Sequence, residues 1–336
     1  MSFSQLLRLS KHLQLIPALE AGEEILVGGQ AVMEGVMMRA PHSYCVAVRQ
    51  PDGTLSTQEQ PIPRMSEKYP LFKYPVLRGL GTLGQAMQLG YRALEFSANA
   101  ALTEVTAAEA APSESEPAAK NTTKISSTVM AVTLALNLAF FIALYKFVPL
   151  FLATKLGGVV PSLSGRFATN MMDGLIRMAI FLGFMFAISL TKDIRRVFEF
   201  HGAEHKVVFN YESGQPVNVQ NAQKFVTFHP RCGTSFMFVM FGMAMILYAL
   251  VPVDGFWLKF GVRIGMLPLI IGLSYELIRF AAKRQGSLMG MLSAPGLWLQ
   301  RITTKPPDDI QTAVAIHALE GAMALEAKQG GTLVIG

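Results

Sequence analysis

Four long apolar segments dominate the chain between residues 127 and 280. They span residues 127–152, 171–191, 234–253 and 258–280. A helix needs roughly 20 mostly apolar residues to cross the hydrocarbon core of a bilayer, and each segment is long enough. One such segment could be a buried helix of a soluble protein. Four in succession predict an α-helical integral membrane protein with about four transmembrane helices.

The composition agrees with a membrane protein. Of the 336 residues, 51% are hydrophobic and only 15% are charged, whereas soluble chains carry about 25% charged residues. The net charge is +6, but the basic residues are spread over several loops and form no nucleic-acid-binding module. We therefore expect a lipid bilayer and no nucleic acid as partner. Two distant cysteines, Cys45 and Cys232, are too few for a disulfide framework and indicate a reducing compartment.

Lys and Arg residues in the short loops predict the orientation of the spans. The loop between the second and third spans and the C-terminal flank are rich in them: Lys192, Arg195, Arg196, Lys206, Lys224, Arg231, Lys283, Arg284, Arg301 and Lys305. The loops on the other side carry only Lys155, Arg166 and Lys259. Both termini and the loop 192–233 are therefore predicted to be cytoplasmic.

Several charged residues lie within the predicted spans. Lys146, Asp173, Arg177 and Arg263 fall toward the outer ends, and we interpret them as side chains that reach the membrane interface. Asp173 and Arg177 are four residues apart and can pair on one helix face. A transporter is disfavoured because the spans show no paired broken helices.

The regions outside the spans predict a small α+β cytoplasmic part. Residues 1–103 are expected to hold a short amphipathic helix, strands within 25–62 around a Pro51–Thr54 turn, and a helix over 72–103. Residues 104–124 predict a disordered linker before the membrane domain, 125–283. The cytoplasmic tail, 284–336, is expected to dock a helix that starts near Asp309 and runs to about Lys328. We interpret His317, on that helix, as an ordinary packing or solvent-facing residue.

The segment His201–His205 carries the strongest chemical signal. His201, Glu204 and His205 form an H-x-x-E-H pattern, which on a helix places both imidazoles on one face with the glutamate beside them. In such sites the histidines bind zinc and the glutamate acts on a water molecule. The same loop contains His229 and Cys232, a nitrogen and a thiolate ligand suited to zinc.

The remaining ligands decide what kind of site this is. A closed set of His201, His205, His229 and Cys232 would be structural and would pin the loop to the membrane domain. Glu276, at the cytoplasmic end of the last span, is an alternative ligand that would leave a position open for water. The plainest alternative is a hydrogen-bonded polar cluster without metal.

A second polar group is embedded in the apolar segment Gly28–Arg39. Gln30, Glu34 and Arg39 would need partners if they are buried. One interpretation is a loop that contacts substrate or supports the metal ligands. The favoured interpretation is a strand and turn closed by a Glu34–Arg39 ion pair.

These residues also carry a resemblance to a known family. The segments Gly28–Arg39, His201–Lys206, His229–Phe236, Tyr275–Arg279 and Pro295–Gln300 resemble the bacterial YqhQ family, over nearly the whole chain from about residue 25. The resemblance implies a metal-dependent enzyme of the bacterial cytoplasmic membrane. It implies that His201, Glu204, His205, His229 and Cys232 form the core of the site, and it identifies no reaction.

The leading hypothesis is a membrane-embedded hydrolase, possibly protease-like, that uses zinc or another divalent metal. His201 and His205 would bind the metal, His229, Cys232 or Glu276 would complete it, and Glu204 would be the general base. Its substrate would lie in or near the membrane. The alternative is a non-catalytic membrane scaffold or assembly factor with a structural metal.

Overall fold

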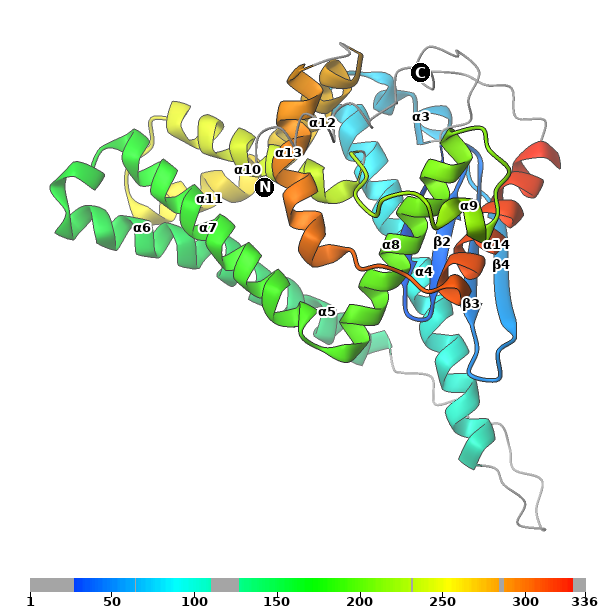
Figure 1. Cartoon of the computed structure of the whole chain (residues 1–336). Coiled ribbons are helices and arrows are strands. Elements are labelled where there is room, and N and C mark those ends of the chain that lie inside the picture. Colours follow the sequence, from blue (N-terminus) through cyan, green and yellow to red (C-terminus); the bar gives the residue numbers. More distant parts are fainter. Residues whose placement is uncertain (1–26, 64, 110–126, 231, 284–286, 329–336) are drawn as a thin grey trace. The chain divides into compact units, whose positions relative to one another are not determined.

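A computed structural model describes residues 27–63, 65–109, 127–230, 232–283 and 287–328. The chain forms two compact units, each made of segments that are distant in the sequence. Unit 1 comprises residues 1–103, 185–239 and 272–336, and unit 2 comprises 104–184 and 240–271 (Figure 1). Unit 1 therefore joins the N-terminal region, the loop 192–233 and the C-terminal tail. The predicted amphipathic helix near the N-terminus lies outside the described residues.

Unit 1 is built around a four-stranded antiparallel meander. Its strands, in the order in which they pair, are β1 (Gly28–Val32), β2 (Gly35–Arg39), β3 (Ser43–Arg49) and β4 (Leu55–Pro61). The predicted turn connects β3 and β4: Gly53 has φ +89°, and Asp52 Oδ1 accepts a hydrogen bond from the Thr54 amide at 2.8 Å. The expectation of a small N-terminal sheet is confirmed.

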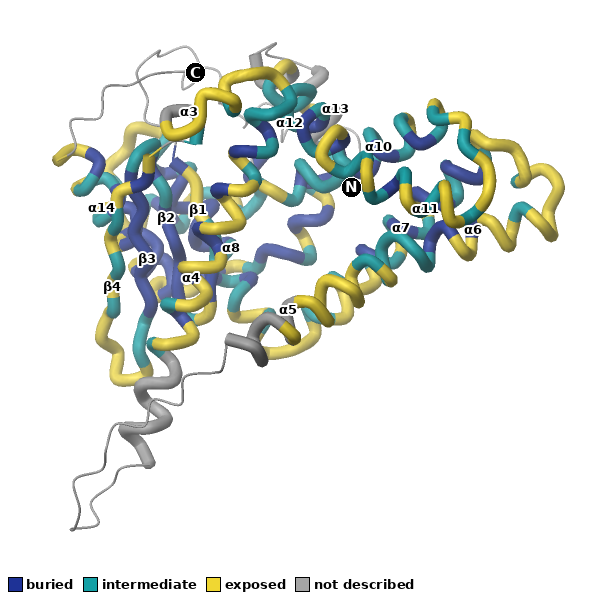
Figure 2. Tube along the Cα trace, turned by 180° about the vertical axis from the view of Figure 1, so that it is seen from behind, coloured by how far each residue is buried: buried dark blue, intermediate teal, exposed yellow. Residues whose placement is uncertain are grey.

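Helices cover both faces of this sheet. Successive strand residues point to opposite faces, so the continuous apolar sequence of β2 and β3 supplies two cores. On one face, Met38 and Cys45 pack with α8 (Lys192–Glu212) and α14 (Asp309–Lys328). On the other, Met37 and Tyr44 share a core with Leu89 and Ala93 of α4 (Leu77–Glu109). Figure 2 shows the two central strands as buried.

Unit 1 contains further helices, and their ends differ from the boundaries predicted for the regions of the chain. They are α3 (Met65–Lys68), η1 (Pro70–Lys73), α9 (Val219–Ala222), α13 (Ser287–Thr303) and the greater part of α12 (Leu267–Lys283). Helix α4 continues to Glu109 and so includes the start of the segment predicted as a linker; residues 110–126 are not described. The docking of α14 on the sheet agrees with the expectation, and His317 is exposed.

Unit 2 contains most of the apolar helices. They are α5 (Ser127–Ile142), the π-helical η2 (Ala143–Phe147), α6 (Val148–Val159), η3 (Pro161–Leu163), α7 (Arg166–Ser189), α10 (Gly233–Leu250) and α11 (Phe256–Gly265), with α7 and α10 continuing into unit 1. In the described part of the chain, three helices are long and apolar enough to cross a membrane: Ala135–Val159, Arg166–Ser189 and Gly233–Leu250. A fourth is present if the pair Phe256–Gly265 and Leu267–Phe280, bent by 49°, counts as one span.

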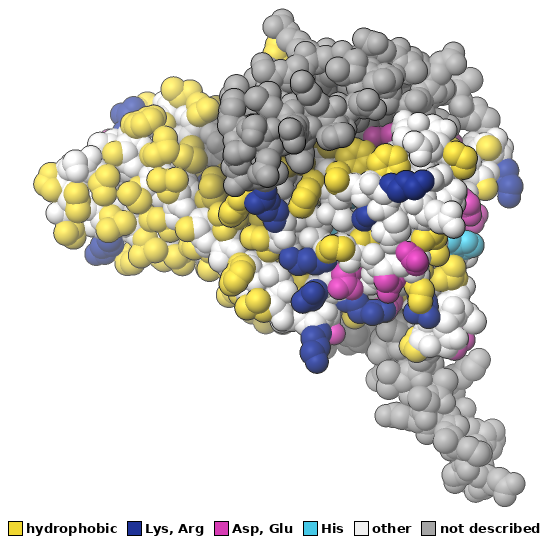
Figure 3. Space-filling view, in the orientation of Figure 1, with side chains coloured by type: hydrophobic (Ala, Val, Ile, Leu, Met, Phe, Trp, Pro, Cys, Tyr) yellow, Lys and Arg dark blue, Asp and Glu magenta, His cyan; other side chains and the backbone are white. Residues whose placement is uncertain are grey.

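The apolar helices are not regular throughout. The first span, Ala135–Val159, is continuous but contains the π-helical segment η2, and the bend lies in the last span if its two helices count as one. The surface of these helices is strongly apolar, as Figure 3 shows. Leu136, Leu138 and Phe140 of α5 are each more than half exposed, which would be unfavourable in water.

Charged residues of the spans also differ from the expectation. Asp173 and Arg177 pair as predicted, with 2.6 Å between Asp173 Oδ2 and Arg177 Nη2. However, Asp173, Arg177 and Arg263 are buried inside unit 2 rather than extended to an interface. Their mutual ion pairs explain why they tolerate burial.

Candidate metal centre

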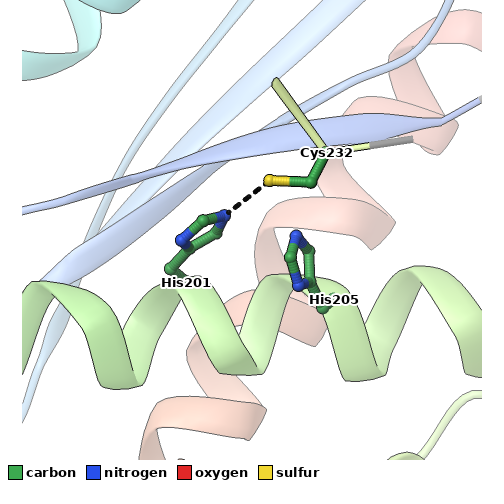
Figure 4. Close-up of side chains that lie close together, drawn as sticks. All are labelled: His201, His205 and Cys232. Carbon is green, nitrogen blue, oxygen red and sulfur yellow. Dashed lines mark hydrogen bonds between the residues drawn. The ribbon is translucent and has the colours of Figure 1, made fainter. Parts of the chain in front are cut away.

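Two histidines and one cysteine converge on the surface of α8. His201 and His205 lie one helical turn apart on the same face, and their ring centroids are 4.5 Å apart. Cys232 precedes α10, and its Sγ lies 3.4 Å from His201 Nε2 (Figure 4). One ligand atom from each of the three residues lies within 4.8 Å of the others.

Backbone carbonyls fix the orientation of both imidazoles. His201 Nδ1 donates to the carbonyl of Thr303 at 2.8 Å, and His205 Nδ1 donates to the carbonyl of Thr227 at 2.5 Å. A carbonyl can only accept, so the proton of each neutral ring is on Nδ1. This leaves the Nε2 lone pairs available, which is the arrangement of metal-binding histidines.

The donor set fits zinc. Zinc–nitrogen bonds of about 2.0–2.1 Å and zinc–sulfur bonds of about 2.3 Å place tetrahedral ligand atoms on the order of 3.3–3.8 Å apart. The 3.4 Å between Cys232 Sγ and His201 Nε2 matches this spacing, and the ligand atoms of the whole group lie within 4.8 Å of one another. Three protein ligands would leave one tetrahedral position open.

Glu204 is buried beside this group and is held between α8 and β1. Its Oε2 lies 3.4 Å from His205 Nε2. A Cβ atom on Gly29 of β1 would stand 2.7 Å from Glu204 Cγ, so the absence of a side chain at Gly29 makes room for the glutamate. The carboxylate therefore has little freedom to move away from the histidines.

A second glycine sets the position of α8. A Cβ on Gly202, next to His201, would collide with the carbonyl of Lys305. The Lys305 amide donates to the carbonyl of Phe198 at 2.8 Å, so the segment after α13 lies directly against α8. This close approach brings the Thr303 carbonyl to His201.

Burial keeps the imidazoles of His205 and His229 neutral. Loss of solvent lowers the pKa of His205, and the hydrogen bond with Cys232 only partly opposes this. Burial also lowers the pKa of His229 to about 4, against the attraction of Glu204. Both rings are therefore uncharged near neutral pH, the form that can bind a metal.

His229 lies in the same region but outside the three-residue group. Its ring is 5.6 Å from that of His205 and 4.4 Å from Phe209, measured between centroids. Its Nε2 is directed at Glu212, 3.5 Å from Oε2. Gln300 holds the backbone of His229 through hydrogen bonds of 2.7 and 2.8 Å. The predicted fourth ligand is thus oriented toward Glu212 in this structure.

Glu276 does not join the group. Its carboxylate accepts hydrogen bonds from Arg78 Nε at 2.6 Å and from the Val76 amide at 3.2 Å. The expectation that Glu276 completes the metal site is corrected, because an arginine of α4 engages both of its oxygens.

A cavity of about 440 Å³ lies next to the three ligands, and β1 forms one of its walls. Gly28, Gly29, Gln30 and Ala31 of β1 line it together with α8 residues and the 229–234 segment. The predicted strand and turn at Gly28–Arg39 are confirmed, and the position of β1 at this cavity agrees with the alternative interpretation of a segment beside the metal ligands. No sequence signal identified the carbonyls of Thr227 and Thr303, because backbone groups carry none.

The predicted Glu34–Arg39 ion pair is wrong. Glu34, at the β1–β2 turn with φ 53°, pairs with Arg196 of α8. Arg39 Nη2 donates to Gln85 Oε1 at 2.7 Å instead. The turn is therefore fastened to the same helix that carries the histidines.

Comparisons with known proteins place the chain in a family. Residues 74–325 match the family described as "Protein of unknown function (DUF1385)". The chain is 35% identical over 305 residues to the "Uncharacterized protein YqhQ" of Bacillus subtilis (strain 168), covering 89% of this chain and 93% of the relative. This confirms the resemblance drawn from the motifs. No solved structure matches the chain.

Proposed function

From the premise that this chain belongs to the DUF1385 family, we propose that it is a membrane-embedded, zinc-dependent hydrolase. One observation carries the proposal: His201, His205 and Cys232 offer three converging ligand atoms, with the Glu204 carboxylate beside them and a cavity in front. Three protein ligands and an open position are typical of catalytic zinc, whereas structural zinc usually has four.

Each residue of the site would have a separate chemical role. His201 Nε2, His205 Nε2 and the Cys232 thiolate would hold the metal, which supplies a Lewis acid for attack by water on a carbonyl or related group. Glu204 Oε2 would accept the proton of the attacking water and return it to the leaving group. The Thr303 and Thr227 carbonyls would keep both imidazoles in the required tautomer.

A location in the bacterial cytoplasmic membrane, with both termini cytoplasmic, completes the proposal. The three to four apolar helices and their exposed Leu and Phe side chains support a lipid environment. The basic residues of the 192–233 loop and the C-terminal flank support the orientation. The site would then act on substrates at or near the cytoplasmic surface of the membrane. A C-terminal reporter that is active only in the cytoplasm would test the orientation.

The first test is metal analysis of the detergent-purified full-length protein. Wild type is expected to contain about one zinc per chain, as is Glu204→Gln, whereas His201→Ala should lose it. His317→Ala is a matched control, because His317 is exposed on α14. Loss of zinc from Glu204→Gln would contradict its role outside the ligand set. Absence of zinc from folded wild type would contradict the proposal itself.

Activity separates a hydrolase from a scaffold. The three ligands connect α8 with the segment before α10, so a metal could also fasten the fold without catalysis. General bases contribute about 10²–10⁴-fold to rate, so Glu204→Gln should lower zinc-dependent hydrolysis of a fluorescent casein by at least about 100-fold at unchanged zinc content. If the protein is instead a scaffold, Glu204→Gln should support the assembly of its membrane partners like wild type, whereas His201→Ala should not.

A further inference from the structure

The interior of unit 2 contains a charged network with more cations than anions. Asp173 is 1% exposed and forms ion pairs with two buried guanidinium groups. Its Oδ2 lies 2.6 Å from Arg177 Nη2, and its Oδ1 lies 2.7 Å from Arg263 Nη1. One carboxylate therefore faces two permanently charged arginines.

The other members of the network add no negative charge. Asn170 Oδ1 accepts from Arg263 Nη2 at 2.5 Å. The Tyr248 ring lies 5.6 and 5.1 Å from the guanidinium carbons of Arg177 and Arg263. Lys146 Nζ donates to Tyr248 Oη at 3.2 Å and brings a third basic side chain. The network thus has a positive excess in a region of low dielectric, which is unfavourable without a further anion.

Both irregular places in the helices carry cations of this network. Lys146 lies in the π-helical segment η2, and Arg263 lies near the bend between α11 and α12. Such interruptions often mark functional positions, because a regular helix would otherwise be more stable.

Arg263 also lines a pocket that contains two further cations and no acidic residue. The lining residues are Arg166, Asn170, Tyr248, Val251, Val253, Lys259, Val262 and Arg263. Within the described part of the chain, neither Arg166 nor Lys259 has an acidic partner. Segments 127–184 and 240–271 together hold six Lys and Arg but two Asp, and the second, Asp254, is exposed and outside the pocket.

We propose that this pocket, formed by Arg166, Lys259 and Arg263, binds a phosphate group. Guanidinium and ammonium groups match the charge and hydrogen-bonding oxygens of phosphate, and a bound anion would offset the excess of the network. The aromatic rings of Phe147, Phe256, Trp257 and Phe260 cluster around the same helix ends. Aromatic residues gather where lipid headgroups lie, which makes an anionic phospholipid a source of the phosphate.

The test compares anions on the full-length protein in a neutral detergent. Thermal unfolding is followed while short-chain phosphatidylglycerol, short-chain phosphatidylcholine or inorganic phosphate is titrated. The double variant Arg166→Gln/Lys259→Gln removes two cations of the pocket. Lys155→Gln is the matched control. Lys155 is a basic residue of the same unit, on α6, where it lies over the Phe151 ring, and it does not line the pocket.

Phosphatidylglycerol is expected to stabilise wild type in a saturable manner, and phosphatidylcholine much less. Each cation near an anionic lipid surface is worth about 1 kcal/mol, so the double variant should bind about 25-fold more weakly, with the control unchanged. Stabilisation by inorganic phosphate with the same dependence on the two residues would support the site with a free anion as its ligand. Equal binding by wild type and the double variant, or no binding of either anion, would overturn the proposal.

Discussion

The histidine–cysteine group of unit 1 is partly buried and the arginine–aspartate network of unit 2 is fully buried, and the two differ in the ligand that they lack. In unit 1, two imidazoles and a thiol direct acceptor atoms to one point, with the Nδ1 donors of both rings already used by carbonyls. In the described part of unit 2, the basic side chains of Arg177, Arg263 and Lys146 outnumber the buried carboxylate of Asp173. An acceptor-rich cluster is suited to a cation, and a donor-rich cluster is suited to an anion. The two clusters are therefore suited to ligands of opposite charge.

The largest effect is expected in unit 2. Asp173→Asn would leave Arg177 and Arg263 buried without their common counter-charge. Breaking a buried ion pair on one side costs about 3–5 kcal/mol, so the thermal unfolding temperature in detergent should fall strongly. Asp254→Asn, at an exposed aspartate, should change it little. Similar unfolding temperatures for the two variants would show that the network does not hold unit 2 together.

In unit 1, a single methyl group should disturb Glu204. Gly29→Ala places a Cβ 2.7 Å from both Glu204 Cγ and the Met37 carbonyl oxygen, whereas a Cβ on Gly84 of α4 meets no atom within 4 Å. Crowding of this kind costs about 1–3 kcal/mol or displaces the side chain. We expect Gly29→Ala to reduce hydrolysis at unchanged zinc content, and Gly84→Ala to behave like wild type in the same assays. Equal activities would remove β1 from the site.

A smaller effect distinguishes Glu276 from the metal ligands. Arg78 and Glu276 are both partly exposed, and such pairs contribute about 1 kcal/mol or less. Glu276→Gln should therefore lower stability slightly and leave zinc content unchanged, as measured by metal analysis. Loss of zinc from this variant would restore Glu276 to the ligand set and contradict the structure.

The smallest effect concerns the docking of α14 and its pH dependence. Burial would raise the pKa of Glu326, but hydrogen bonds from His42 and Ser43 outweigh it and lower the pKa below the usual 4.5. A carboxylate with a lowered pKa stabilises the fold fully above about pH 4.5, and this contribution is lost as the pH falls below that value.

Thermal unfolding between pH 3 and 6 measures this contribution. Wild type should lose stability more steeply than Glu326→Gln as the solution becomes acidic. Parallel pH profiles for the two proteins would contradict a role of the ionised Glu326 in holding α14.

The sequence predicted those features that follow from a local pattern of residues. Long apolar segments predicted the apolar helices, and the H-x-x-E-H spacing placed His201 and His205 on one face of α8. It failed where partners come from distant segments. Nothing in the sequence links Glu276 to Arg78 or Glu34 to Arg196, because these contacts depend on how separate helices and strands pack. The wall formed by β1 and the burial of Asp173 depend on tertiary structure in the same way.

X-ray absorption at the zinc edge, on the purified full-length protein, tests the central claim most directly. Two histidine nitrogens at about 2.0–2.1 Å, one sulfur at about 2.3 Å and one further light atom are expected. The sulfur should disappear in Cys232→Ser, and the spectrum of Glu204→Gln should keep both histidines and the sulfur. A spectrum without sulfur, or one that requires a third histidine in place of the light atom, would contradict an open three-ligand site.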